Sequence, residues 1–180
     1  MNRYKNPDQA ELGVVQQAYA ELDAVDALLK PPSRGDGGPV MASELLAYAC
    51  GEAAEAGRVK AALIRFPSMR GVLKNMVVRM SDYQMPEAIA ASTKEFPERR
   101  TEGCRVRLEA SRAEADQNYL IIELVEGGEI PSVLTLCDAE NEFEQITLPS
   151  PRRGVIQVIV TNESGIPDML RDPKTAIYLR

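Results

Sequence analysis

The chain has 180 residues, of which 44% are hydrophobic and 27% are charged, and its net charge at pH 7 is −6. These values are typical of folded globular proteins, and the length suits one large domain or two small ones. Histidine is absent, which excludes Ser-His-Asp and Cys-His catalysis and the HExxH zinc motif. The three cysteines are widely spaced and odd in number, so they indicate neither a disulfide framework nor a paired-thiol metal motif. We expect no cofactor and no metal.

Charge and hydropathy also bear on partners and location. An acidic chain without a concentrated basic face is a poor candidate for direct nucleic-acid binding, but it suits a basic protein partner. No apolar run approaches the roughly 20 residues that span a bilayer. The N-terminal stretch MNRYKNPDQAELG lacks the apolar core of a secretory signal. We therefore expect a cytoplasmic protein that does not bind membranes.

The first predicted element is a helix over residues 8–29. Its apolar side chains recur at three- and four-residue spacing, Asp8 can cap its start, and a Lys-Pro-Pro sequence ends it. The stretch PPSRGDGGPV, residues 31–40, follows as a linker rich in proline and glycine. Because of this linker, the helix is interpreted either as one helix of a bundle or as a partner-binding arm. The candidate partner-binding residues on the arm are Leu12, Val15, Tyr19 and Leu22.

Three short helices are predicted next, at residues 41–49, about 52–65 and 68–80. Pro67 separates the second from the third, because proline disfavours a helical residue before it. The third helix is rich in methionine, and such helices adapt well to partner surfaces, although the same spacing also fits a packed core. Its candidate partner-binding residues are Leu73, Met76, Val77 and Met80.

Residues 83–103 are polar and contain prolines, so a connector is expected there. From Cys104 onward apolar residues recur with a period of two, as in β-strands. Six short strands are predicted, at 104–110, 119–125, 132–137, 143–148, 154–161 and 176–180. Short strands divided by turn-like stretches indicate a small antiparallel sandwich or barrel, of which we favour the sandwich. The predicted fold class is α+β, with a helical bundle over 1–82 and a β-sandwich over 104–180.

Two helical segments resemble a known family. The stretches LLAYACGE, residues 45–52, and RVKAALIRFPSMR, residues 58–70, are similar to the zinc-binding anti-sigma domain of bacterial anti-sigma factors. In this chain Ala62 stands at the family's histidine position, and Phe66 and Met69 stand at its two cysteine positions. A structural zinc contributes on the order of 10 kcal/mol in small domains. The resemblance therefore implies a degenerate, zinc-free form in which an apolar cluster replaces the metal.

Anti-sigma factors of this family bind an extracytoplasmic-function-type sigma factor and block the surfaces that contact RNA polymerase. The resemblance implies a cytoplasmic, non-catalytic regulator that sequesters such a sigma factor by laying apolar helix faces into its grooves. The alternative is a non-catalytic adaptor whose helices dock and whose β-sandwich recognises a protein partner. A third possibility is an enzyme that uses Glu109 and Glu123, although alternation places both on a solvent face.

One basic pair in the β region also has two interpretations. Arg152 and Arg153 lie in a predicted turn between two strands. They are either solvated loop residues or contacts for an acidic partner or a phosphate.

Overall fold

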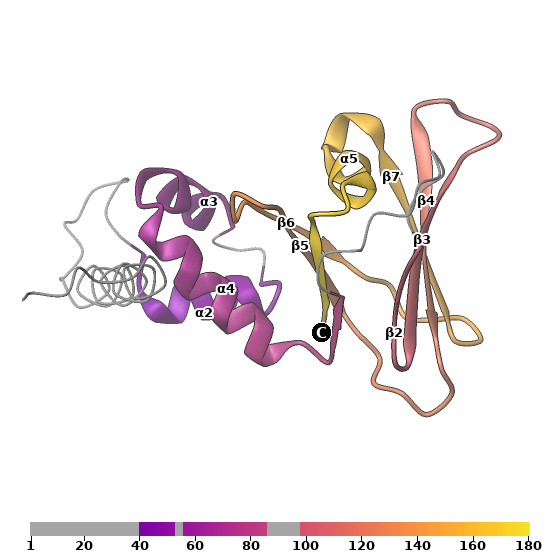
Figure 1. Ribbon diagram of the computed structural model, residues 1–180, viewed down its shortest axis with the longest axis horizontal. Helices are drawn as coiled ribbons and strands as arrows, with labels where there is room; N and C mark the ends of the chain where they lie inside the picture. Colours follow the sequence, from indigo (N-terminus) through magenta and orange to yellow (C-terminus); the bar gives the residue numbers. More distant parts are fainter. Residues whose placement is uncertain (1–39, 53–55, 86–97) are drawn as a thin grey trace, which may run out of the picture. The chain divides into compact units, whose positions relative to one another are not determined.

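The computed structural model describes residues 40–52, 56–85 and 98–180. The chain divides into two compact units, a helical one that ends at Asn75 and a β-rich one that runs from Met76 and includes the short stretch Ala49–Gly51 (Figure 1). The helix predicted over residues 8–29, residues 31–39 of the linker and the candidate residues Leu12, Val15, Tyr19 and Leu22 lie outside the described residues. The complete helical bundle therefore stays a prediction.

Three helices form where the sequence predicts them: α2 (Ala42–Ala49), α3 (Ala56–Arg65) and α4 (Ser68–Met80). The start of α2 is fixed by Glu44, whose carboxylate accepts a hydrogen bond from the Met41 N–H at 2.6 Å. This is the return half of a capping box, which satisfies a backbone donor that has no partner within the helix. The same carboxylate forms an ion pair with Arg58, which joins α2 to α3.

The β-rich unit contains two antiparallel four-stranded sheets, in the orders β1-β8-β5-β6 and β2-β3-β4-β7. A short helix, α5 (Ile166–Arg171), and a single 3-10 turn, η2 (Asn162–Ser164), lie between the last two strands. The strands are β1 (Tyr83–Met85), β2 (Arg99–Thr101), β3 (Cys104–Ala110), β4 (Gln117–Leu124), β5 (Val133–Cys137), β6 (Phe143–Thr147), β7 (Val155–Thr161) and β8 (Ala176–Leu179).

Apolar side chains from both sheets form one core. Every second residue of a strand points to the same face, so Val106 and Leu108 of β3 are buried while Arg105 and Arg107 point outward. Side chains from seven of the eight strands and from α5 meet in this core. Its fully buried members, with an exposed fraction of 0 or 1%, are Leu120, Ile122, Leu134, Leu136, Ile156, Ile177 and Leu179. Two sheets packed through their inner faces are the arrangement of a β-sandwich.

The six strands predicted from residue 104 onward are confirmed, but the segment predicted as a connector, 83–103, contains two further strands. Strand β1 pairs with β8, and β2 pairs with β3. Both are three residues long, which is too short for alternation to be recognised in the sequence. Each nevertheless extends one of the two sheets, so this segment belongs partly to the sandwich.

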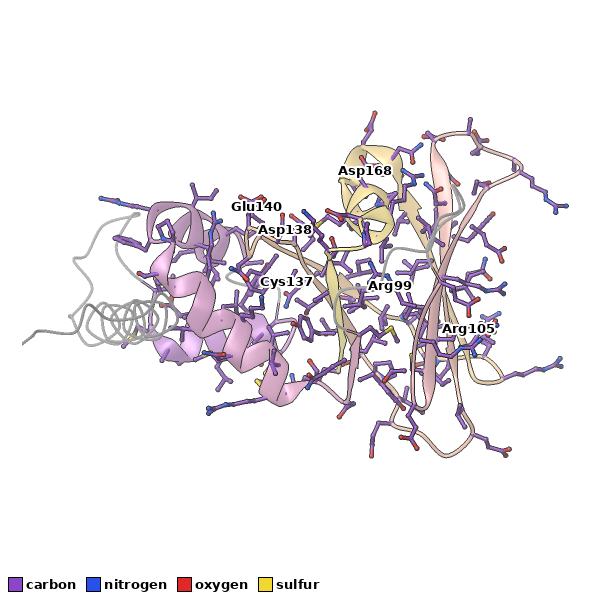
Figure 2. All side chains as sticks on the ribbon, viewed as in Figure 1. Arg99, Arg105, Cys137, Asp138, Glu140 and Asp168 are labelled. Carbon is purple, nitrogen blue, oxygen red and sulfur yellow. The ribbon has the colours of Figure 1, made fainter. Side chains whose placement is uncertain are left out.

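Strand β2 also places a charged side chain inside the sandwich. Arg99 is 4% exposed and lies between the two sheets, whereas Arg105 lies on the outer side (Figure 2). The Arg99 guanidinium donates a hydrogen bond to the Asp172 carbonyl at 2.8 Å, just after α5. Burial lowers the pKa of Arg99, and the nearby Asp172 opposes that shift. The side chain therefore ties β2 to the segment that leads into β8.

No helix within residues 40–52, 56–85 and 98–180 combines the length and the apolar content that a membrane-spanning helix needs.

Candidate partner-binding surfaces

The turn between α3 and α4 contains Ala62, Phe66 and Met69, the three residues predicted from the sequence to be degenerate zinc-ligand positions. The Phe66 N–H donates to the Ala62 carbonyl at 2.7 Å, and the Met69 N–H donates to the Phe66 carbonyl at 3.0 Å. Ala62 and Met69 are buried, with exposed fractions of 5% and 0%, and Phe66 is half-buried. Backbone hydrogen bonds and apolar burial thus stabilise this turn.

Two arginines add to the same turn. The Arg70 Nε donates to the Leu63 carbonyl at 3.1 Å, which satisfies an acceptor in the last turn of α3. The Arg65 guanidinium lies 5.5 Å from the centre of the Phe66 ring, within the range of a cation–π contact. Among the described residues, no group of three His, Cys, Asp or Glu side chains is placed to hold a metal ion.

The candidate partner-binding residues of α4 differ in accessibility. Leu73 and Val77 are buried, with exposed fractions of 0% and 3%, while Met76 and Met80 are half-buried. Leu73 and Val77 therefore pack inside the protein. This agrees with the alternative that their helical spacing reflects a packed core. A partner that binds this face in its present conformation reaches parts of Met76 and Met80 only.

Three other apolar side chains of the helical region are well exposed. Ile64 on α3 is 72% exposed, Met41 just before α2 is 50% exposed and Leu46 on α2 is 46% exposed. These three residues were not among those predicted from the sequence, because that prediction selected apolar residues that recur at helical spacing. An apolar residue outside the buried face of its helix was the signal that could have identified them. Ile64 is an example, since the buried face of α3 contains Val59, Ala62 and Leu63. These side chains are better placed to contact a partner than Leu73 or Val77.

The outer face of the second sheet carries a ladder of ion pairs. Arg107 contacts Glu109 at 2.7 Å and Glu123 at 3.1 Å, and Arg105 contacts Glu123 at 3.3 Å. Glu109 and Glu123 are the two carboxylates considered for an enzyme. Each is held by arginine on a partly exposed surface, where such pairs contribute little stability. This arrangement is typical of a solvated sheet face.

The buried cysteines are unsuited to nucleophilic chemistry. Cys104 and Cys137 are 3% and 1% exposed. Burial raises the pKa of the Cys104 thiol to about 11, so the thiol is protonated at neutral pH. Because the thiolate is the reactive form, Cys104 acts as a small core residue.

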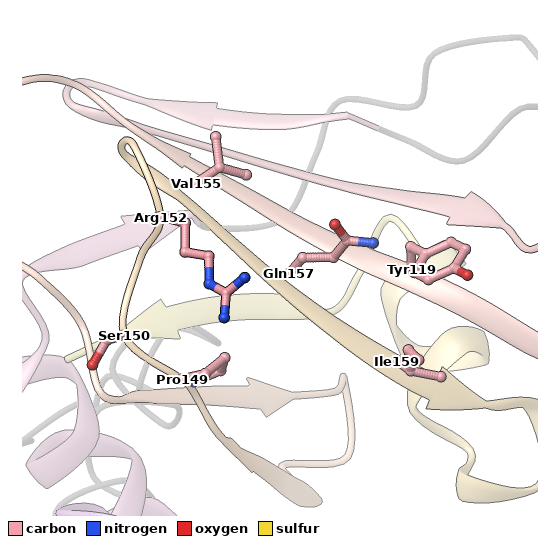
Figure 3. Close-up of a pocket in the computed structure, with 7 residues that line it drawn as sticks. All are labelled: Tyr119, Pro149, Ser150, Arg152, Val155, Gln157 and Ile159. Atoms are coloured by element: carbon pink, nitrogen blue, oxygen red, sulfur yellow. The ribbon is translucent and has the colours of Figure 1, made fainter.

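A groove of about 450 Å³ follows β7 on the outer side of the second sheet (Figure 3). Arg152 and Val155 lie at one end, and Tyr119 and Ile159 lie at the other. Ile159 is 55% exposed and Val155 is 37% exposed. The wall opposite β7 comes from Pro149 and Ser150 in the segment between β6 and β7. Sequence reasoning considered Arg152 for an acidic partner, but it did not predict the groove.

Comparison with known proteins assigns the chain to no group. No protein-family model matches it, no curated protein matches it significantly, and neither does any solved structure. The arguments for function therefore come from the sequence and from the geometry described above.

Proposed function

We propose that this protein is a cytoplasmic, zinc-free, anti-sigma-like regulator that binds an extracytoplasmic-function-type sigma factor through its helical region. The observation that supports the proposal is the α3–α4 turn. Ala62, Phe66 and Met69, which stand at the ligand positions of the resembling family, lie within one turn, and two of them are buried. In this proposal, apolar packing at the turn takes the place of a metal in holding the two helices together.

The binding energy in this proposal comes from apolar helix surface. An amphipathic helix that enters a groove buries its apolar side chains, and each Leu or Ile removed from water contributes roughly 1.5–3 kcal/mol. Ile64 and Leu46 are exposed on α3 and α2, so both can be buried by a partner without refolding. The arm residues predicted from the sequence, such as Leu12 and Tyr19, supply a second contact in this proposal.

The test is affinity purification of the tagged full-length chain from its native host, with quantitative mass spectrometry of the bound proteins. The expected result is a sigma factor in near-equal amount. Replacing Ile64 and Leu46 by Asp should remove it, because two charges then enter an apolar interface. The matched control is Ile159→Asp, which places the same charge on the sheet and should leave the sigma factor bound.

Recovery of no sigma factor, or recovery that the Ile64 and Leu46 substitutions leave unchanged, would contradict the proposal. Circular dichroism of each variant checks that the helices remain folded. All these positions are exposed, so unfolding is not the expected effect.

A second candidate function is a non-catalytic adaptor whose sandwich recognises a protein partner. The groove beside β7 favours it, since the exposed side chains of Ile159 and Val155 line an open surface of the β-rich unit. Purification of a partner other than a sigma factor, lost with Ile159→Asp and kept with the helical substitutions, is the result expected for an adaptor.

A further inference from the structure

The edge of strand β7 has backbone groups that are free to bind another strand. Among the strands of residues 40–52, 56–85 and 98–180, β7 is the last of its sheet and pairs only with β4. The Leu124 N–H donates to the Gly154 carbonyl at 2.8 Å, and hydrogen-bonded pairs alternate along an antiparallel ladder. The even-numbered residues of β7 therefore bond to β4. Gln157 and Ile159 direct their N–H and C=O groups to the open edge.

This open edge is short because both of its ends are occupied. At one end, Val155 exchanges both backbone hydrogen bonds with Arg152, at 2.8 and 3.1 Å. Arg153 and Gly154 between them have φ of 54° and 77°, as a tight two-residue hairpin turn requires. At the other end, the Thr161 carbonyl accepts the Ser164 hydroxyl at 2.7 Å. Two residues remain between, with two donors and two acceptors.

The edge of β7 also lacks the usual protection against strand addition. Edge strands are commonly very short or carry charged side chains. The edge strands β1 and β2 have three residues each, and β2 contains two arginines. β7 has seven residues, VIQVIVT, and none of them is charged. Its side chains at the groove, Gln157 and Ile159, are both exposed.

The single charge in the groove is Arg152. Its side chain extends from the hairpin turn toward Pro149 (Figure 3). Within residues 40–52, 56–85 and 98–180, no carboxylate pairs with its guanidinium. The groove therefore combines four backbone hydrogen-bonding groups with an apolar end at Tyr119 and Ile159. Its other end, which the Arg152–Val155 hairpin closes, carries the Arg152 cation.

We propose that this groove binds the carboxyl-terminal end of a protein partner as an added antiparallel strand, with the terminal carboxylate at Arg152. A strand that pairs with Ile159 and Gln157 must stop before Val155, because Arg152 already occupies the backbone groups of that residue. A chain end fits there better than a continuous segment. Arg152 attracts a carboxylate and repels an ammonium group, which selects the carboxyl end and hence the antiparallel direction.

The proposal also defines the side chains of the bound segment. In strand addition the backbone supplies affinity, and alternate side chains supply specificity. The residue opposite Ile159 points to the outer face of the sheet beside the exposed Ile159 side chain, so it should be apolar. The binding mode does not depend on whether the helical region binds a sigma factor, since the groove lies within the β-rich unit.

The test uses the full-length chain and synthetic peptides of about seven residues with an N-terminal fluorophore and a free carboxyl terminus. The last four positions are randomised among Val, Ile, Thr, Ser and Tyr. Peptides retained by the immobilised chain are identified by mass spectrometry and measured singly by fluorescence polarisation. The expected result is selective binding that weakens about tenfold or more when the terminus is amidated, because a charge-assisted hydrogen bond is lost.

Matched variants locate the binding. Arg152→Gln should weaken the free-acid peptides about tenfold and leave the amidated peptides unchanged, while Arg153→Gln, with the same charge change outside the groove, should have no effect. Ile159→Lys should weaken both kinds of peptide, whereas Ile130→Lys, at another exposed apolar position, should not.

Three results would overturn the proposal. The first is that no peptide binds selectively. The second is that amidated and free-acid peptides bind equally, which would indicate an internal segment. The third is a dimer in light scattering that Ile159→Lys dissociates, which would assign the edge of β7 to a second copy of this chain.

Discussion

Truncation of Met69 tests whether apolar packing stabilises the α3–α4 turn. Met69 is 0% exposed, and alanine at this position removes the side chain beyond Cβ. Buried Met→Ala substitutions cost about 2–5 kcal/mol, which includes the cavity left behind. The cost within this range depends on how far the surrounding side chains close the cavity, and we expect a loss near its middle, about 3 kcal/mol.

The chain contains no tryptophan, so urea unfolding is best followed by circular dichroism at 222 nm, where helices dominate the signal. With a slope of about 2 kcal/mol per molar urea, a loss of about 3 kcal/mol lowers the midpoint of the helical transition by about 1.5 M. The two units need not unfold together, so each transition is fitted separately.

Two control variants make this result interpretable. Met69→Leu conserves volume and should cost less than about 1.5 kcal/mol. Ile64→Ala, on the exposed side of α3, should change stability by no more than about 0.5 kcal/mol. If Met69→Ala costs no more than the exposed control, the apolar cluster does not stabilise the turn, and the argument for a zinc-free form fails.

Other predictions concern the β-rich unit. Glu123→Gln removes the shared partner of two arginines and should cost no more than about 1 kcal/mol by urea unfolding, with the effect shrinking at high salt. Gly103→Ala should cost at least about 1 kcal/mol, because φ is +88° and the new Cβ lies 3.1 Å from the Tyr83 ring. The folded-state pKa of Cys104 is raised, so the unfolded state loses its proton first. Stability should therefore fall as pH rises from about 9 toward 11, and Cys104→Val should reduce that slope.

The strands of the sandwich were predictable because their signal is local. β3 alternates buried apolar residues with arginines over seven residues, and the pattern alone locates it. β1 and β2 carry no such signal, since a three-residue strand has one alternation at most. They form because β8 and β3 provide hydrogen-bonding partners for them. These pairings depend on the tertiary structure and cannot be recognised from three residues of sequence. The six residues of α5 are likewise too few for a helical period to be recognised.

The candidate surfaces were less predictable for a related reason. Helical spacing identifies Leu73 and Val77 as one face of α4, but it does not tell whether a partner or the protein's own core covers that face. The open edge of β7 depends on which of its residues form hydrogen bonds with β4. The pairing register of the two strands determines this, and the sequence of β7 alone does not reveal it. The sequence indicates Arg152 as a candidate contact for an acidic partner or a phosphate. Its position at the end of the groove follows from the hairpin turn at Arg153 and Gly154.

The hairpin turn at Arg152–Val155 also bears on solubility. An uncharged edge strand of seven residues is a template onto which identical strands can stack without limit, and fibril-forming segments typically need six or seven paired residues. The turn occupies one end of β7 and the Ser164 hydroxyl donates to the Thr161 carbonyl at the other, so only Gln157 and Ile159 keep both backbone groups open. An added strand can pair there, but a growing sheet cannot continue along the whole edge. Loosening this turn, for example with Gly154→Val, should therefore increase aggregation on storage as well as lower stability.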